Sequence, residues 1–495
     1  MSTSASPNPS AYEKKATVGA LVLLFQSGLA QLATLLGNLA LARLLRPVDF
    51  GIFVMVQFTA GLFSLLGDIG LGPALIQKES APTACQTSTA FFGQLGVASL
   101  VVALVWFSSP WLPSLWPEFP SQGPWILRAL ALAYFFNSLR SIPIALLERE
   151  LRFVPIALID SVDSIVFNGS AVFFAWLGFG PWALAAGTLI QSLSSLILAL
   201  LFRPLKPFWK FDLDAWKSLL SFGVAHQLRV IVVFLTRSAV PLIGGTLFGA
   251  QAVGFINWAL ENGLFVLTFV NLLGRIVFPL LSRLQAETNH FRLALEQFLR
   301  VALSLGFGVG SVFVGLAEDI TRIVFSDQWL PATSLFAVYA GGITLGLLPN
   351  VLIPVLYAVG KPHLALRFQV INGVLVWLLT AVGSLTIGML GFALGHVVAM
   401  TAGSLLLWKA SRPFFHLNGA PSLLRFYAGP LGAGIFVCFM NQTLLAPWVK
   451  DPLTLGTAVI ASICAYLGAL RILDPSAFYA LVKQIRGSKG PNHSY

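Results

Sequence analysis

The chain has 495 residues, of which 57% are hydrophobic and only 10% are Asp, Glu, Lys or Arg. A soluble domain carries about 25% charged residues, so this composition excludes an ordinary water-soluble fold and indicates a membrane protein. The net charge of +11 does not indicate a nucleic-acid partner, because the basic residues lie in short segments between apolar runs and form no basic face.

The chain opens with a polar tail, residues 1–16, that lacks the pattern of a removable signal peptide. Apolar segments then follow one another to the end of the chain, each long enough to cross a bilayer about 30 Å thick as a helix. The fourteen predicted spans are 17–42, 50–76, 86–108, 125–147, 154–178, 180–202, 217–240, 249–274, 297–317, 329–358, 366–388, 390–411, 425–447 and 454–473.

The segments between these spans distribute the basic residues unequally. One side receives 22 of the 30 Lys and Arg residues and the other side receives four. Basic residues concentrate in cytoplasmic loops, so the asymmetry predicts that both termini are cytoplasmic in a multi-pass protein of a bacterial inner (plasma) membrane.

We divide the spans into two lobes and a final pair. The N-terminal lobe, 17–202, holds spans one to six, and the C-terminal lobe, 217–411, holds spans seven to twelve. A basic, aromatic-rich cytoplasmic linker, 203–216, joins the lobes, and 412–473 contains the last two spans. The cytoplasmic tail 474–495 has two interpretations, a surface-lying amphipathic helix or a solvated tail.

Short matches between the lobes indicate an internal repeat. They lie at offsets of 215, 210 and 203 residues and pair Leu151–Phe153 with Leu366–Phe368, Trp182–Leu184 with Phe392–Leu394, and Gly51 with Gly254. The numbers of matching spans differ by six. Because six is even, both copies have the same orientation in the membrane. The sequence therefore predicts an all-α membrane protein with two six-helix lobes related by a pseudo-two-fold axis along the membrane normal, plus two C-terminal helices.

Polar residues recur at helical spacing in the first two spans of each lobe. The stripes contain Ser27, Gln31, Thr34 and Asn38 in span one, Gln57, Gly61, Ser64 and Asp68 in span two, His226, Arg229 and Arg237 in span seven, and Asn257, Glu261, Thr268, Asn271 and Arg275 in span eight. Polar groups are costly in lipid and turn inward, so we expect a cavity between the lobes. Its predicted substrate-binding residues are Gln31, Asn38, His226, Arg229, Arg237, Asn257, Glu261 and Asn271. The alternative for the neutral residues is hydrogen bonding between packed helices.

Ionised residues at membrane depth point more strongly to function. Arg229 and Glu261 are the best cavity candidates. Asp160 and Asp163 share one face of span five, and with Glu261 they are candidates for coupling transport to a cation. The alternative for the two aspartates is pairing with Arg140 in span four.

The predicted pathway matches an anionic, hydrated cargo. A guanidinium binds phosphate oxygens in a bidentate manner, and Gln, Asn and Ser are natural partners of sugar hydroxyls. Asp68 and Arg275 are assigned to the cytoplasmic interface, where long side chains reach water.

Motifs of catalysis are absent from the sequence. It contains no P-loop, no HExxH and no CxxC, and its three scattered cysteines fit no metal or disulfide pattern. The predicted non-cytoplasmic loops are too short to carry the acid–base residues of a glycan polymerase. We therefore expect no catalytic residues, no metal and no cofactor, and a protein that is not an enzyme.

Three stretches resemble the polysaccharide and O-antigen flippases, the Wzx-type lipopolysaccharide biosynthesis proteins of the multidrug/oligosaccharidyl-lipid/polysaccharide exporter superfamily. Ala42–Gly51 (ARLLRPVDFG), with Arg43, is similar to the signature after the first helix, and Asp68–Gln77 (DIGLGPALIQ) is similar to the end of the second. Arg275–Gln285 (RIVFPLLSRLQ) resembles the element that ends span eight. The stretch Arg237–Gly245 departs from the family pattern, because it carries a basic residue without the usual acidic one.

The resemblance implies a flippase for undecaprenyl-diphosphate-linked oligosaccharide in O-antigen, capsule or exopolysaccharide assembly, working by alternating access. The expected partners are this lipid-linked substrate and membrane lipids, with a polysaccharide polymerase and chain-length machinery as candidates. Two alternatives remain at this point: a small-molecule or drug exporter of the same superfamily, and a membrane glycan polymerase or ligase.

Overall fold

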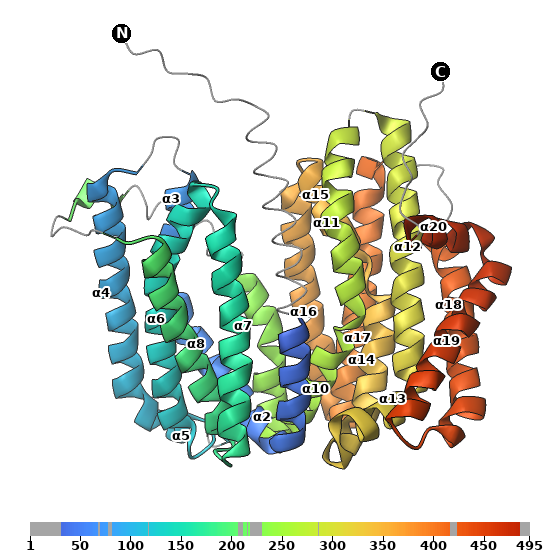
Figure 1. The fold of residues 1–495 in the computed structure, drawn as a ribbon, viewed down its shortest axis with the longest axis horizontal. Helices are drawn as coiled ribbons and strands as arrows, with labels where there is room; N and C mark the ends of the chain where they lie inside the picture. The colour runs from blue at the N-terminus through green and yellow to red at the C-terminus, as the bar shows by residue number, and fades with distance from the viewer. Residues whose placement is uncertain are drawn as a thin grey trace, which may run out of the picture. The chain divides into compact units, whose positions relative to one another are not determined.

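The computed structural model describes residues 31–67, 70–77, 82–116, 118–205, 211–214, 216–217, 230–285, 287–415 and 423–485. Over these residues the chain forms helices and turns and no strand (Figure 1). This confirms the all-α prediction. The chain divides into two compact units, Met1–Phe234 and Leu235–Tyr495. The assignment of six spans to each lobe, with the linker at 203–216 and a separate final pair, stays a prediction.

The N-terminal unit consists of long helices joined by short connections. After a helix over 31–44, its elements are α2 (Pro47–Gly67), α3 (Leu71–Gln77), α4 (Ala84–Ser108), α5 (Leu112–Leu115), α6 (Gly123–Arg149), α7 (Phe153–Trp176) and α8 (Pro181–Phe202). α8 packs along both α6 and α7, and α4 packs against α6. The unit is therefore built around α6 and α8.

Local sequence explains where these helices begin and end. Thr83 and Gln86 form a capping box that starts α4, because each side chain accepts a hydrogen bond from the other residue's backbone N–H. Between α7 and α8 the chain turns through Gly178 and Gly180, whose φ angles of 81° and 56° favour glycine, and Pro181 then opens α8.

The C-terminal unit has more helices, several of them broken. Its elements are α10 (Gly245–Gly263), α11 (Val266–Leu284), α12 (Thr288–Gly315), α13 (Ala317–Ile320), α14 (Thr333–Leu345), α15 (Leu348–Ala358), α16 (Pro362–Ile387), α17 (Met389–Ser411), α18 (Leu423–Met440), α19 (Pro452–Leu473) and α20 (Pro475–Ile485). Its interior is aromatic: Trp258 and Trp329 stack with ring centroids 4.9 Å apart, and Phe336 packs beside them.

Glycines bring α16 and α17 into backbone contact. A Cβ atom on Gly391 would meet the carbonyl oxygen of Gly383, and a Cβ atom on Gly395 would meet the carbonyl oxygen of Leu379. Gly391 and Gly395 form the small-xxx-small spacing that lets membrane helices approach closely. We call this contact of Gly383, Gly391 and Gly395 the glycine seam.

Twelve helices among the described residues are long and apolar enough to cross a membrane. Many of their large apolar side chains face outward. On α16, for example, the exposed large apolar residues are Leu366, Val370, Ile371, Val374, Leu378, Val382, Leu385 and Ile387. Such an apolar surface is stable in lipid and not in water, so the chain is a multi-pass membrane protein.

The predicted count of fourteen spans is not confirmed. Most of span one, 17–42, lies outside the described residues. The end of predicted span seven and most of span eight fall within one stretch, Val230–Thr268, whose 39 residues exceed the 17–25 or so that one crossing needs. Gly249 interrupts that stretch with the non-helical angles φ 78° and ψ 178°, at the predicted start of span eight.

The end of the chain favours the helical interpretation of the tail. α20 packs on α12 and α19, with Ala477 and Leu481 buried. Arg300 of α12 donates a hydrogen bond to the Ser476 hydroxyl at 2.9 Å and lies 3.5 Å from the Asp474 carboxylate. An apolar face and one charged pair thus hold α20 against its unit.

Candidate functional site

The N-terminal unit contains a polar cavity of about 280 Å³ between the 31–44 helix, α2, α7 and α8. Its lining residues are Thr34, Phe53, Gln57, Ser164, Phe167, Asn168, Thr188 and Gln191. Six of these eight side chains are polar and uncharged, although all four helices are predominantly apolar. We call this site the polar cavity.

The polar stripes predicted from the sequence meet here in part. Thr34 belongs to the stripe of span one and Gln57 to that of span two, and Asn168 lies on the same face of α7 as Asp160 and Ser164, at four-residue steps. The cavity therefore joins polar positions from helices that are far apart in the chain.

Two hydroxyl groups of the polar cavity donate hydrogen bonds within their own helices. Ser164 donates to the carbonyl oxygen of Asp160 at 3.2 Å, and Thr188 donates to that of Leu184 at 2.9 Å. Each keeps its oxygen as an acceptor.

The amides of the cavity differ from its hydroxyls. Asn168 is 5% exposed, and its Nδ2 donates to the Ser164 carbonyl at 2.7 Å while its Oδ1 has no partner among the described residues. It packs directly on Gly37, where any Cβ atom would overlap it. The side-chain amides of Gln57 and Gln191 have no hydrogen-bond partner in the described part of the chain. Unpaired amides inside apolar helices are costly, so this site suits a hydrated ligand.

A charged cluster lies next along α7. The Arg140 Nη2 atom of α6 is 3.0 Å from Asp160 Oδ1 and 3.1 Å from Asp163 Oδ2. Ser195 of α8 donates a hydrogen bond to Asp163 at 3.0 Å. The Asp163 side chain is 9% exposed and that of Asp160 is 48% exposed. The pairing with Arg140 that the sequence suggested is therefore present, and a coupling role for the two aspartates stays a prediction.

The remaining predicted residues do not line the polar cavity. Gln31, Asn38 and Arg43 are exposed on the 31–44 helix. In the C-terminal unit Arg237, Glu261 and Asn271 are exposed and Asn257 is half-buried. His226, Arg229 and Asp68 lie outside the described residues, as does the side chain of Arg275. The predicted cavity between the lobes therefore stays a prediction.

Sequence reasoning missed the contribution of span six. Thr188, Gln191 and Ser195 of α8 are spaced by three and four residues and face the polar cavity or the charged cluster. Their helical spacing is the same signal that marked spans one and two. α8 thus carries a further polar stripe of the N-terminal unit.

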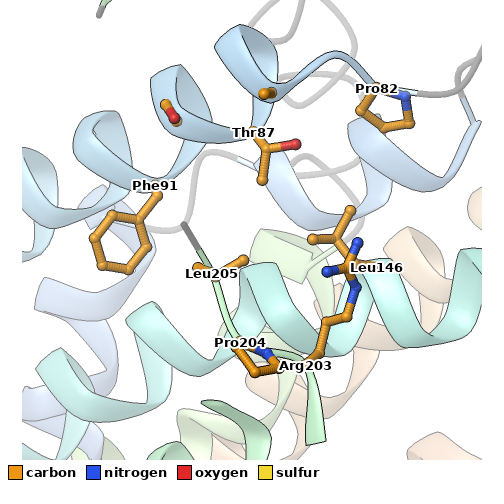
Figure 2. A pocket seen from close by; sticks show the side chains of 9 residues that line it. Pro82, Thr87, Phe91, Leu146, Arg203, Pro204 and Leu205 are labelled. Atoms are coloured by element: carbon orange, nitrogen blue, oxygen red, sulfur yellow. The ribbon is translucent and has the colours of Figure 1, made fainter. Parts of the chain in front are cut away.

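A larger cavity of about 450 Å³ lies where α4 begins and α6 and α8 end (Figure 2). Figure 2 shows Thr87 and Phe91 of α4 across from Leu146 and Arg203. The Arg203 Nε atom already donates a hydrogen bond to Glu150 at 2.8 Å. The cation of this cavity therefore has a counter-charge of its own, and the polar cavity remains the stronger candidate.

Comparison with known proteins identifies the family. Residues 40–334 match the family described as polysaccharide biosynthesis protein, which is more than half of the chain. The chain belongs to this family. The match includes α2 to α8, and with them the charged cluster and every described lining residue of the polar cavity except Thr34.

Two proteins named for polysaccharide biosynthesis are identical to this chain at about a quarter of the aligned residues. The teichuronic acid biosynthesis protein TuaB of Bacillus subtilis is 24% identical over 315 residues, which are 62% of this chain and 64% of TuaB. The lipopolysaccharide biosynthesis protein WzxC of Escherichia coli is 23% identical over 398 residues, 78% of this chain and 77% of WzxC. The match thus spans somewhat less than two thirds of TuaB. The resemblance to Wzx-type proteins is confirmed.

Solved structures show the same fold. The lipid II flippase MurJ in its inward closed conformation matches with a TM-score of 0.73 and 15% identity, covering 91% of this chain and 98% of MurJ. An inward-facing multidrug resistance transporter of the MATE family matches with a TM-score of 0.55 and 16% identity, covering 81% of this chain and 100% of the transporter. At these identities the likeness concerns the fold alone.

Proposed function

We propose that this protein is a flippase that translocates undecaprenyl-diphosphate-linked oligosaccharide units across a bacterial inner membrane. The units would serve O-antigen, capsule or exopolysaccharide assembly. One observation carries the proposal: a membrane protein of the polysaccharide biosynthesis family has a cavity lined by neutral polar side chains within predominantly apolar helices. Polar side chains are costly in lipid-crossing helices, and a pathway for a hydrated cargo accounts for their gathering in one cavity.

The proposed transport proceeds by alternating access. The arginines of the predicted inter-lobe pathway, Arg229 and Arg237, would hold the diphosphate, because a guanidinium binds phosphate oxygens in a bidentate manner. Neutral polar side chains would accept the glycan while the lipid tail stays in the bilayer. Glu261, Asp160 and Asp163 are the proposed groups for coupling to a cation. In this proposal the protein transports its cargo without changing it chemically. Both of its termini lie in the cytoplasm. Its proposed partners are a polysaccharide polymerase and the chain-length machinery.

Deletion and complementation test the proposal in the native host. Deleting the gene is expected to remove one surface polysaccharide and to leave undecaprenyl-linked repeat units in the inner membrane, where lipid extraction and mass spectrometry detect them. The wild-type chain is expected to restore the polysaccharide. Arg229→Ala and Glu261→Ala should each restore it only partly, whereas the control Arg322→Ala, at an exposed pair with Glu318, should restore it fully.

Two outcomes contradict the proposal. If the deletion strain has normal surface polysaccharide and no accumulated repeat units, the chain is not their flippase, and an exporter of small molecules becomes the better reading. If the purified protein catalyses glycosyl transfer onto lipid-linked units, it is a polymerase or ligase. Full complementation by both cavity variants would remove Arg229 and Glu261 from the proposed pathway.

A further inference from the structure

The described residues that line the polar cavity offer amides, hydroxyls and two phenylalanine rings, and none of them is charged. We propose that it binds a single uncharged sugar ring of the cargo and thereby selects which glycan is carried. This inference rests on the proposed flippase function, because it assigns one sugar-recognition site within that pathway. It concerns the N-terminal unit alone and is separate from the arginines proposed to hold the diphosphate.

The size of the cavity limits the ligand to one ring. Its volume of about 280 Å³ lies just below the roughly 300–1,000 Å³ of typical small-molecule sites. It equals the volume of about nine waters at roughly 30 Å³ each. A monosaccharide fits this space, whereas a complete repeat unit of several sugars does not. The rest of the glycan would remain outside the cavity.

The hydrogen-bonding groups of the cavity match sugar hydroxyls. Gln57 and Gln191 have no hydrogen-bond partner among the described residues, and each offers two N–H donors and a carbonyl acceptor. The hydroxyls of Ser164 and Thr188 donate to backbone carbonyls of their own helices, so toward a ligand their oxygens can act only as acceptors. A hydroxyl both donates and accepts, so a ring that carries several can satisfy both amides at once.

Apolar groups of the cavity match the remainder of a sugar ring. Phe53 of α2 and Phe167 of α7 also line it. A pyranose has C–H groups as well as hydroxyls, and sites for small polar ligands combine apolar walls with a few placed polar groups. Neither phenylalanine offers a partner for a phosphate or a carboxylate.

Charge in and around the cavity disfavours an anionic sugar. Arg140 of α6, whose guanidinium reaches α7, is already shared by Asp160 and Asp163. That cluster contains two carboxyl groups and one guanidinium, so it supplies no surplus positive charge. A carboxylate brought into this site would lose part of its hydration without gaining a counter-charge. The cavity therefore favours neutral hexoses and N-acetylhexosamines over uronic acids.

Direct binding of soluble sugars tests this inference without requiring transport. The full chain in lipid nanodiscs would be titrated with methyl glycosides of glucose, galactose, mannose and N-acetylglucosamine, and with glucuronic and galacturonic acid. Saturation-transfer NMR reads out the weak affinities expected for one ring. At least one neutral glycoside should give a saturable signal, and the two acids should give none.

Variants locate the signal. The double variant Gln57→Leu/Gln191→Leu should weaken binding at least about fivefold, because each lost hydrogen bond is worth roughly a two- to tenfold change. Thr188→Val, which keeps the shape of the side chain, should weaken it about two- to tenfold. Gln122→Leu, at the exposed start of α6, is the matched control and should bind as the wild type does. Leucine is favourable in an apolar helix, so the double variant is expected to fold, and its thermal midpoint checks this.

The outcomes separate this inference from the flippase proposal. The assignment of the sugar site is wrong if no neutral sugar binds, or if the folded double variant binds as well as the wild type. This conclusion holds even if the deletion strain lacks polysaccharide. If the acids bind as well as the neutral sugars, the proposed charge selection is wrong. Binding that is lost in the double variant supports the site, even if the deletion strain keeps its polysaccharide and the flippase proposal fails.

Discussion

Replacement of Arg140 by leucine is the most informative test of the charged cluster. The guanidinium lies 3.0 Å from Asp160 and 3.1 Å from Asp163, and Asp163 is almost completely buried. Without Arg140, Asp163 keeps the Ser195 hydroxyl as a hydrogen-bond partner but loses its cation. The variant therefore leaves a buried carboxyl group whose charge has no counter-charge.

The magnitude follows from the geometry. Two unit charges 3 Å apart interact by about 5 kcal/mol at an effective dielectric constant of 20. Asp160 is half exposed, so solvent screens most of its interaction with Arg140. Breaking a buried pair by removing one partner costs about 3–5 kcal/mol. We expect Arg140→Leu to lower the free energy of unfolding by about this amount.

Unfolding by SDS titration, followed by circular dichroism, measures the effect. Arg140→Leu/Asp163→Asn should recover most of the loss, because the double variant leaves no buried charge. Arg322→Leu is the matched control: its partner Glu318 is exposed, and such pairs contribute at most about 1 kcal/mol. The reasoning is refuted if Arg140→Leu costs less than the control, or if the double variant is less stable than Arg140→Leu.

Three further predictions concern helices of the C-terminal unit. Gly395→Val should lower the thermal midpoint of unfolding in differential scanning fluorimetry, because the valine side chain would overlap the backbone of α16. The control Gly456→Ala should leave the midpoint unchanged, because Gly456 faces open space. Equal midpoints for the two variants would contradict the close packing of α16 and α17. Backbone N–H groups at the start of α19 hold the pKa of Asp451 below its ordinary value, so its stabilisation is present above pH 3.8 or so and is lost as the pH falls through the lowered pKa. Asp451→Ala should therefore lower the midpoint at pH 7 and make no difference at strongly acidic pH, and a constant deficit would refute this. Arg300→Met should increase proteolysis of α20 by added protease, and unchanged cleavage would show that the apolar face alone holds it.

Hydropathy predicts the helices of this fold well, because in lipid every crossing segment must satisfy its own backbone. The same physics limits prediction at Val230–Thr268, where the apolar run continues through the kink at Gly249. A glycine in an apolar sequence does not by itself reveal its positive φ angle. Predicted span bounds are therefore least certain where one apolar helix passes directly into another.

The candidate site is predictable only in part, and the reason is chemical. Thr34, Gln57 and Asn168 were visible as polar positions in apolar spans, and Arg140 as a partner for two aspartates. Serine and threonine obscure the pattern, because a hydroxyl that donates to its own helix, as Thr188 does, looks the same in sequence as one that faces a ligand. Which helices face one another depends on tertiary packing that no stripe specifies.

The glycine seam has a mechanical consequence for any transport cycle. With the backbone of Gly391 against that of Gly383, neither helix has a side chain at the contact that can change rotamer to accommodate sliding. A shift of a fraction of a turn would drive neighbouring side chains into the opposing backbone. α16 and α17 are therefore expected to travel as one rigid hairpin, and the strain of a conformational change must be absorbed elsewhere, at interrupted helices such as α10 with its Gly249 break.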